Sequence, residues 1–206
     1  GALFFDLETG LSQKSADPAY GGRHPLPAPE RFGVLLGEKG IKPSHHLIVY
    51  DDKYGSNAAA RLWWMLKAVG HQKVQLIDGG HAAIAATGAN LSTGEEKSLS
   101  PAQAYPVGNW KLPLADIEMV ERATTEDDYL IVDVRENYRY NGESEPIDLV
   151  AGHIPGAVNA PYLDNLAPDG RFRSPQALAK QFEILRKGRE MQKLIVHCGS
   201  GVTACH

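Results

Sequence analysis

The sequence predicts an α/β protein in which parallel strands are joined by crossover helices. Short apolar runs typical of buried strands alternate with a stretch of helical spacing at residues 56–69. Alternation of this kind favours parallel sheets flanked by helices. The 206-residue chain is long enough for two domains, and its 43% hydrophobic and 22% charged residues are typical of globular proteins.

The predicted elements follow one another in an order that occurs twice. Residues 46–51 have the pattern of a strand, the helical stretch follows, Gly70 marks its end, and residues 74–80 form a second strand and turn. In the second half, residues 129–135 have the pattern of a buried strand that ends in polar residues. A Gly-His-Ile-Pro turn and a further strand at residues 193–198 come after it.

These similarities predict an internal repeat. Residues 1–4 resemble residues 156–159, and aligning residues 46–51 with residues 193–198 places Asp51 at the position of Cys198. Two unrelated αβ segments would share apolar strands but not this order of turn, strand and helix. Residues 88–114 are rich in Gly, Pro and polar residues, which is typical of a linker. We therefore divide the chain into domains 1–105 and 106–206.

Cys198 has the surroundings expected of a nucleophile. It follows a strand and begins a turn containing Gly199 and Gly201, and a Val-Thr-Ala-Cys stretch able to start a helix comes next. Backbone amides in such a turn, and the positive end of a helix, stabilise a thiolate or a bound anion. The glycines permit backbone conformations that side chains block. The alternative is that Cys198 is a small buried core residue.

Composition excludes several other classes of function. The net charge of −4, without a basic block, argues against nucleic acid and anionic membranes as partners. No apolar run approaches the about 18 residues that a membrane-spanning helix needs. The eight histidines and two cysteines lack metal-ligand spacing, and His45 and His46 are adjacent. Two cysteines and no signal peptide lead us to expect a cytoplasmic protein.

The motifs together resemble the two-domain rhodanese-type sulfurtransferases. The resemblance rests on the stretches AGHIPGA (151–157), VDVR (132–135), CGSGVT (198–203), WWMLKAVGH (63–71) and IDGG (77–80). It implies tandem rhodanese-like domains, each a parallel sheet flanked by helices, with a catalytically silent first domain. Members of the family extend before Gly1 and beyond His206, with an active-site helix among the added elements. We therefore expect the second domain to be incomplete in this chain.

The resemblance also implies a reaction. Cys198 would take a sulfane sulfur from 3-mercaptopyruvate or thiosulfate and become a persulfide. A thiophilic acceptor such as cyanide, a thiol or thioredoxin would then remove that sulfur. The backbone N–H groups of the loop would hold the persulfide anion, and they belong to Gly199, Ser200, Gly201, Val202 and Thr203. The partners are thus small molecules, no metal or organic cofactor is implied, and we expect a monomer.

The loop sequence CGSGVT is similar to that of the mercaptopyruvate branch. The thiosulfate branch carries Arg and Lys where this chain has Gly199 and Ser200. The resemblance implies a relay in which Ser200, His24 and Glu8 deliver a proton to the leaving enolate, at an interface between the domains. Asp6 is the competing choice of acid.

A keto acid donor also needs a cation for its carboxylate. Arg139 matches the family arginine that faces the cysteine, and its guanidinium fork suits a carboxylate. A second arginine of the mercaptopyruvate branch is replaced by Ile147 in this chain. Thiosulfate therefore remains an alternative donor. We interpret Asp133 and Arg135 as a structural polar pair at a strand end.

Two further residues have structural interpretations. We interpret His153 as a residue that stabilises the Gly-His-Ile-Pro turn. Cys205, seven residues after Cys198, would point into the core, and the alternative is a resolving thiol for oxidised Cys198.

Three rival functions remain to be weighed. A cysteine phosphatase of similar fold needs an arginine six residues after the cysteine, where this chain has Ala204. A non-catalytic rhodanese-like binding or regulatory module would make Cys198 incidental. A protein sulfur carrier would hand its persulfide to a protein acceptor, which the sequence leaves open.

Overall fold

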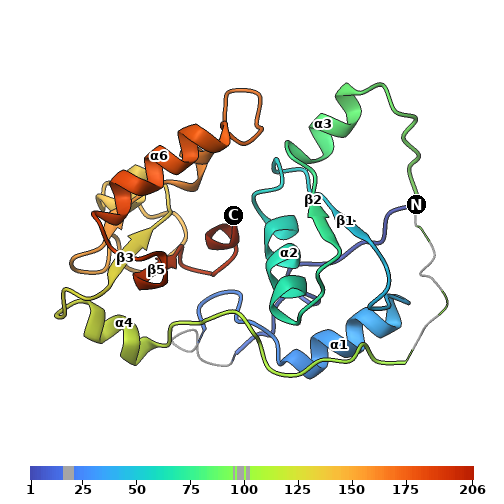
Figure 1. The fold of residues 1–206 in the computed structure, drawn as a ribbon, viewed down its shortest axis with the longest axis horizontal. Helices are drawn as coiled ribbons and strands as arrows, with labels where there is room; N and C mark the ends of the chain where they lie inside the picture. The colour runs from blue at the N-terminus through green and yellow to red at the C-terminus, as the bar shows by residue number, and fades with distance from the viewer. Residues whose placement is uncertain (16–20, 95, 97–99, 101–102) are drawn as a thin grey trace. The chain divides into compact units, whose positions relative to one another are not determined.

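The computed structural model describes residues 1–15, 21–94, 96, 100 and 103–206 (Figure 1). Contacts divide the chain into two compact units, residues 1–113 with 205–206, and residues 114–204. Both units contain parallel strands with helices packed on them, so the predicted α/β class is confirmed. Among the described residues, no helix is both long enough and apolar enough to cross a membrane.

The first unit is built around a parallel pair of strands. Its elements are α1 (Pro29–Glu38), β1 (Leu47–Val49), α2 (Ala58–Ala68), β2 (Val74–Leu76) and α3 (Gly80–Ala86). Leu47 of β1 is in register with Val74 of β2. Parallel neighbours need a crossover connection, and α2 provides it, lying beside both strands in Figure 1. The helix predicted at residues 56–69 is thus confirmed, and it ends where Gly70 adopts a φ of 90°.

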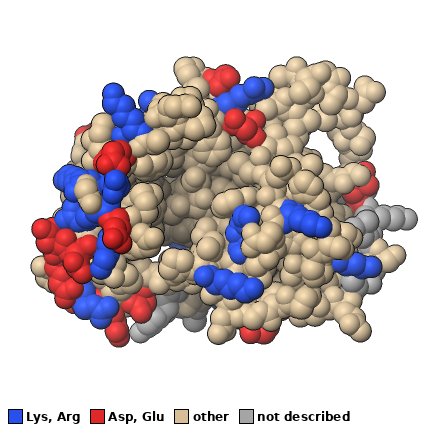
Figure 2. Space-filling model, viewed as in Figure 1, with Lys and Arg blue, Asp and Glu red and all other residues tan. Residues whose placement is uncertain are grey.

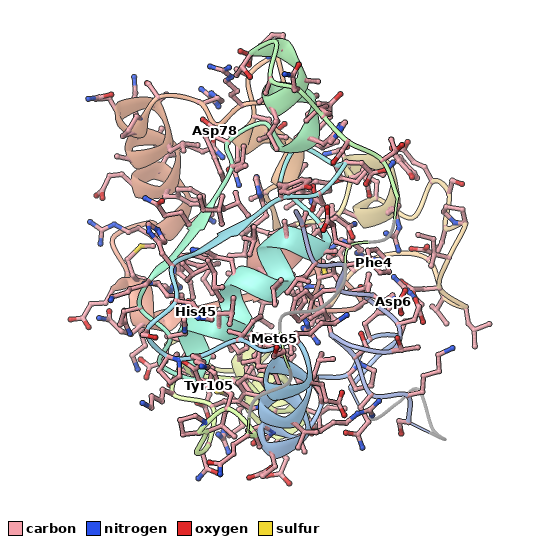
Figure 3. All side chains as sticks on the ribbon, turned by 90° about the vertical axis from the view of Figure 1, so that its right-hand side faces the viewer. Phe4, Asp6, His45, Met65, Asp78 and Tyr105 are labelled. Carbon is pink, nitrogen blue, oxygen red and sulfur yellow. The ribbon has the colours of Figure 1, made fainter. Side chains whose placement is uncertain are left out.

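The core of the first unit lies between α1, α2 and the strands. Met65 of α2 and Phe32 of α1 are fully buried there, and Tyr105 is buried in the same cluster. Figure 3 labels Met65 within α2 and Tyr105 near it. Trp110 contacts the rings of both Phe32 and Trp64 at 6.0 Å between centroids. These aromatic contacts tie residues 105–110 to the helices.

The predicted linker packs on the first unit over residues 103–113; six of its residues, 95, 97–99 and 101–102, lie outside the described ranges. The Tyr105 amide donates to the Gly33 carbonyl at 2.9 Å, and a Cβ added to Gly33 would approach the Tyr105 carbonyl oxygen to 2.7 Å. The Tyr105 hydroxyl lies 2.8 Å from Nδ1 of the buried His71. The absence of a side chain at Gly33 therefore lets the segment around Tyr105 approach α1 closely.

The second unit contains a three-stranded parallel sheet. Its helices and strands are α4 (Ile117–Ala123), β3 (Leu130–Asp133), α5 (Asn137–Tyr140), β4 (Val158–Asn159), α6 (Pro175–Arg186) and β5 (Leu194–His197). The strand order is β4-β3-β5, and all four residues of the central strand β3 are buried. Single turns of 3-10 helix occur at η1 (Tyr162–Asn165), η2 (Met191–Lys193) and η3 (Thr203–Cys205).

Alternate residues of β3 face opposite layers, as a strand with both faces buried requires. Ile131 packs with Ala123, Ile195 and residues of α4, whereas Val132 packs with Leu185 of α6. Helices therefore cover both faces of the sheet, and the expected helix–sheet–helix arrangement is present in this unit. In the Val-Thr-Ala-Cys stretch, the last three residues form the 3-10 turn η3.

The junction between β1 and α2 is organised by one carboxylate. Oδ1 of Asp51 accepts hydrogen bonds from the amides of Lys53 and Gly55 at 2.9 and 2.7 Å. Oδ2 accepts from the amides of Asn57 and Ala59, both at 3.0 Å. Amides at the start of a helix have no partner within the helix, and a negative charge is favourable there. Asp51 thus replaces a conventional capping residue, since Asn57 makes no side-chain cap.

We predict that Asp51→Asn destabilises the first unit by about 2 kcal/mol or more, because it removes the charge and points an amide donor at backbone donors. Urea unfolding followed by tryptophan fluorescence measures this directly, since Trp63, Trp64 and Trp110 all belong to the first unit. Asp52→Asn is the matched control, because that exposed carboxylate has only a 4.0 Å ion pair with Lys53. Equal unfolding midpoints for the two variants would contradict the prediction.

Candidate active site

Cys198 lies directly after the carboxyl end of β5 and is 4% exposed. β5 pairs with the central strand β3, and the His197 carbonyl accepts a hydrogen bond from the Val134 amide just beyond it. The carboxyl ends of parallel strands are where ligands bind in open α/β sheets. The sequence-based expectation of a cysteine between a strand and a turn is confirmed.

The environment of the sulfur favours the thiolate. Burial alone would raise the pKa of the Cys198 thiol. The Thr203 hydroxyl and the amides of Ser200, Val202 and Ala204 hydrogen-bond to the sulfur, outweigh that effect and hold the pKa below its ordinary value. A thiolate near neutral pH is the form that acts as a nucleophile.

The loop reaches this arrangement through its glycines. Gly199 and Gly201 have φ angles of 100° and 66°, in the left-handed region that favours glycine, as predicted. The turn that follows is only three residues long, so individual amides and one hydroxyl stabilise the thiolate here. The expected contribution from the end of an α-helix stays a prediction.

The loop after Cys198 and the loop after Asp51 place backbone amides around an anionic side chain at the same relative sequence positions. The sulfur of Cys198 receives the amides two, four and six residues after it, and the carboxylate of Asp51 receives those at the same three positions, with a fourth from Ala59. The residue three positions on is left-handed in both loops, Tyr54 at 60° and Gly201 at 66°. The first unit thus has a similar loop of backbone amides, which the carboxylate of Asp51 occupies. This similarity between the units supports the predicted repeat.

The predicted polar pair at the end of β3 is confirmed. Nη2 of Arg135 lies 2.6 Å from Oδ2 of Asp133, which is fully buried, and Nη1 lies 3.2 Å from Oε2 of Glu145. The hydrogen bond that Arg135 donates to Asp133 is the main cause of the raised pKa of Arg135, and the nearby Cys198 thiolate adds to it. Arg135 therefore lies near the cysteine, which sequence reasoning missed because only the fold brings β3 and β5 together.

Arg139 is buried in a cluster of acids. Its Nη2 lies 2.9 Å from both Oε1 of Glu145 and Oδ2 of Asp148. Glu145 also accepts the amide of Ile147, the residue that replaces the second family arginine and is 55% exposed. The guanidinium of Arg139 is thus already engaged by two carboxylates, and its predicted role as the substrate clamp stays a prediction.

The contact predicted between His24 and Glu8 is present in the first unit. Nε2 of His24 lies 2.6 Å from Oε1 of Glu8, and this hydrogen bond is the main cause of the lowered pKa of Glu8. Asp6 instead binds the amide and hydroxyl of Thr9, both at 2.8 Å. Nδ1 of His24 is buried and has no hydrogen-bond partner among the described residues. An imidazole with one nitrogen held by an acid and the other unpaired is what a proton relay needs.

Ser200 and Arg139 belong to the second unit, whereas His24 and Glu8 belong to the first. The relay of Ser200, His24 and Glu8 therefore stays a prediction, as does the binding of a persulfide by Gly199, Gly201, Val202 and Thr203. Ser200 is half-buried and its amide is one of the donors to Cys198.

His153 has the structural role that was expected. Its Nδ1 lies 2.7 Å from the Tyr140 carbonyl, and its ring stacks on that of Tyr140 with 3.8 Å between centroids. Cys205 is half-buried on η3, and neither cysteine forms a disulfide.

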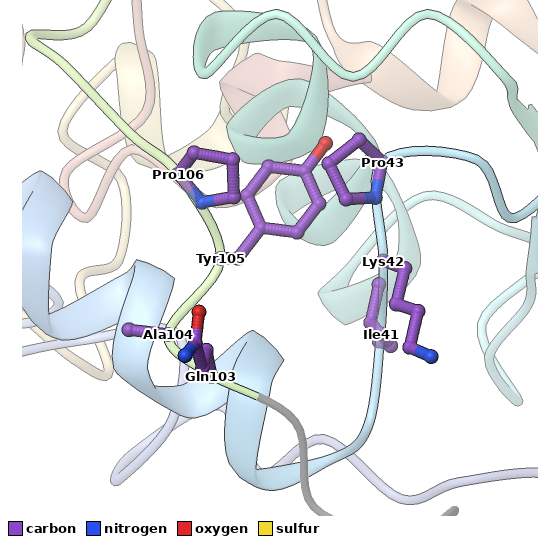
Figure 4. Close-up of a pocket in the computed structure, with 7 residues that line it drawn as sticks. All are labelled: Ile41, Lys42, Pro43, Gln103, Ala104, Tyr105 and Pro106. Carbon is purple, nitrogen blue, oxygen red and sulfur yellow. The ribbon is translucent and has the colours of Figure 1, made fainter.

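Two of the cavities formed by described residues lie in the first unit. One of about 320 Å³ is lined by Glu8, Lys14, Ser15, Gly22, Arg23 and His24. The other, of about 420 Å³, lies between residues 41–43 and 103–106, with the Tyr105 ring between Pro43 and Pro106 (Figure 4). Only the first contains residues of the predicted relay. Within the described ranges, no group of three or more His, Cys, Asp or Glu side chains is placed to hold a metal ion.

Comparison with known proteins identifies the family. The rhodanese family, described as "Rhodanese-like domain", matches residues 116–206. A probable 3-mercaptopyruvate sulfurtransferase of Pseudomonas aeruginosa is 42% identical over 207 residues, covering 100% of this chain and 72% of that protein. The chain belongs to the rhodanese-type sulfurtransferases. Its predicted fold class and its resemblance to this family are confirmed.

Other relatives carry either of two names. A thiosulfate sulfurtransferase of Mus musculus is 36% identical over 210 residues, covering 100% of this chain and 68% of that protein. The solved structure of a 3-mercaptopyruvate sulfurtransferase from Leishmania major has a TM-score of 0.83 at 30% identity, covering 97% of this chain and 54% of that one. Rhodanese-type relatives named for both donors are thus similar to this chain over nearly its whole length.

We predict that Thr203→Val slows alkylation of Cys198 by iodoacetamide about fivefold at pH 7. This factor corresponds to the free energy of one hydrogen bond to the thiolate. The hydroxyl contributes to the lowered thiol pKa, so its loss raises the pKa and reduces the thiolate fraction at neutral pH. The rates should converge at high pH, where both proteins are fully ionised. A Cys205→Ser background removes the second thiol, and Thr203→Ser, which keeps the hydroxyl, is the control. A Thr203→Val protein that reacts as fast as the parent at pH 7 would refute this.

Proposed function

We propose that this protein is a sulfurtransferase that moves a sulfane sulfur to a thiophilic acceptor through a persulfide on Cys198. The observation that carries the proposal is the buried sulfur of Cys198, hydrogen-bonded by three amides and a hydroxyl at the carboxyl end of β5. Its membership of the rhodanese-type family supports the same conclusion.

The proposed donor is 3-mercaptopyruvate. The Cys198 thiolate attacks the thiol sulfur of the donor, an S–S bond forms, and the C–S bond of the donor breaks. The electron pair of that bond leaves as the enolate of pyruvate, which takes up a proton and becomes pyruvate. No external oxidant or reductant is needed, because the donor carbon is reduced as the transferred sulfur joins the cysteine.

Ser200, His24 and Glu8 are the proposed source of that proton. The 2.6 Å contact between His24 and Glu8 fixes one ring nitrogen and leaves Nδ1 for a hydroxyl. Thiosulfate leaves as sulfite and forms no enolate, so this relay distinguishes the two donors. The loop has no Lys or Arg side chain at Gly199 and Ser200 and offers mainly backbone amides. This also favours the keto acid as the donor.

The second half-reaction regenerates the thiolate. A cyanide ion attacks the outer sulfur of the persulfide and leaves as thiocyanate, and the electron pair of the S–S bond returns to Cys198. A small thiol or thioredoxin is the proposed physiological acceptor, and both fit a reducing cytoplasm, as do two cysteines without a disulfide.

We predict that Cys198→Ser lowers thiocyanate formation by more than about a thousandfold with either donor, because it removes the atom that carries the sulfur. Cys205→Ser should retain activity. The measurement is steady-state sulfur transfer to cyanide. Transfer by Cys198→Ser at the rate of the parent would overturn the proposal, and no transfer by the parent protein with either donor would favour a binding module.

We also predict that Ser200→Ala lowers kcat with 3-mercaptopyruvate about a hundredfold, while kcat with thiosulfate changes much less. The substitution keeps the amide that binds Cys198, so the thiol pKa should not change. Steady-state rates with both donors, and the pH dependence of alkylation as the control, measure the two effects. An equal loss with both donors would contradict the relay.

A further inference from the structure

Negative charge is in excess around the two buried arginines of the second unit. Residues 114–204 contain ten Lys and Arg against fifteen Asp and Glu. Figure 2 shows acidic side chains gathered over this unit on the face in view. The cluster at the end of β3 consists of two arginines and four acids, Arg135, Arg139, Asp133, Glu136, Glu145 and Asp148. Four carboxylates outnumber two guanidinium groups, so the cluster has a surplus of negative charge.

The cluster lies within electrostatic reach of Cys198. The Val134 amide donates to the His197 carbonyl at 3.0 Å, so the chain leaves β3 beside the residue that precedes the cysteine. The pKa of Arg135 is raised mainly by its hydrogen bond to Asp133, and the Cys198 thiolate adds to the shift. The His197 ring lies 3.8 Å from Asp133, but burial lowers its pKa, so it is neutral near pH 7 and does not offset the surplus. An anionic donor that approaches the sulfur therefore meets a negative field.

Asp148 is the accessible one of the two acids that hydrogen-bond to Arg139. Glu145 is 3% exposed and accepts from Nε of Arg139 with both oxygens, at 3.1 and 3.0 Å. Asp148 is 28% exposed, and its Oδ2 lies 2.9 Å from Nη2. The side chains of Ile147 and Leu149, on either side of it, are exposed. Asp148 thus adds a charge at the rim of the cluster from a segment that contributes little to the core.

We propose that Asp148 is a specificity-determining residue that disfavours dianionic donors at Cys198. Its carboxylate occupies Nη2 of Arg139 and adds to the surplus of negative charge. The proposal rests on the proposed function, in which 3-mercaptopyruvate and thiosulfate are alternative donors. Thiosulfate carries two negative charges and 3-mercaptopyruvate carries one carboxylate. A fixed charge therefore repels thiosulfate about twice as strongly, since the Coulomb energy is proportional to the charge of the donor.

The kinetic test uses Asp148→Asn, which removes the charge and keeps the shape of the side chain. We expect kcat/KM to rise about threefold with 3-mercaptopyruvate and about tenfold with thiosulfate, because the logarithm of the change scales with donor charge. Both factors should shrink at high salt, which screens the charge. Equal factors for the two donors, or factors that salt does not change, would overturn the proposal.

Glu143→Gln is the matched control. Glu143 is an exposed acid of the same loop, and its Oε1 accepts from the Asn141 side chain at 3.0 Å instead of from an arginine. Its loss changes the net charge of the unit by the same amount as Asp148→Asn. We expect kcat/KM with both donors to stay close to that of the parent. A preference for thiosulfate that rises as much in Glu143→Gln as in Asp148→Asn would overturn the role of Asp148.

A second measurement does not depend on sulfur transfer. Iodoacetate is an anion and iodoacetamide is uncharged, and both alkylate the thiolate. The ratio of their rates therefore reports the field at Cys198 and cancels any change in the thiol pKa. In a Cys205→Ser background we expect the ratio of iodoacetate to iodoacetamide rates to rise about threefold in Asp148→Asn. It should not change in Asp148→Glu, which keeps the charge. The same ratio in Asp148→Asn and the parent would overturn the proposal.

The two measurements separate this proposal from the proposed function. Far-UV circular dichroism shows that each variant is folded. If the parent transfers sulfur from neither donor but the alkylation ratio rises in Asp148→Asn, the proposed function fails and charge selection by Asp148 stands. If the parent transfers sulfur and neither the ratio nor the donor preference changes in Asp148→Asn, the role of Asp148 fails and the proposed function stands.

Discussion

Both units of this protein turn from a parallel strand into the next segment around one anionic side chain. Backbone amides at the second, fourth and sixth positions converge on the carboxylate of Asp51 in one unit and on the sulfur of Cys198 in the other. Backbone amides that are buried at such a turn without a hydrogen-bond partner destabilise the fold. The fold therefore needs an anionic side chain at this position, whether or not that side chain takes part in a reaction. The position of the reactive sulfur, its lowered pKa and the need for glycine at 199 and 201 follow from this constraint.

The different occupants of the two loops separate their roles. A carboxylate with two oxygens satisfies four amides permanently, so the loop of the first unit is complete and cannot take a ligand anion. A thiolate gives the same amides a single atom that can form and break a bond to sulfur. The buried network of Asp133, Arg135 and Glu145 near Cys198 is satisfied by its own ion pairs.

Sequence reasoning succeeded where the signal is local. The strand before Cys198, the glycines after it, the helix over residues 58–68 and the pair of Asp133 and Arg135 are all encoded within a few residues. Contacts made by loops without periodicity have no such local signal. Nothing near Arg139 reveals that Glu145 and Asp148 occupy its guanidinium together, since both acids are contributed by a loop without periodicity. The packing of Tyr105 on Gly33 is equally hidden, because a backbone contact with glycine leaves no compositional trace in a proline-rich segment.

In the proposed function, the Cys198 thiolate held by the loop accepts one sulfur atom from the donor. Intact mass spectrometry of the full chain after incubation with 3-mercaptopyruvate, without an acceptor, tests it most directly. We expect the protein to gain the mass of one sulfur, peptide mapping to assign it to Cys198, and cyanide to remove it. A protein whose mass does not change, or that carries the added sulfur on Cys205 alone, would rule out a persulfide on Cys198.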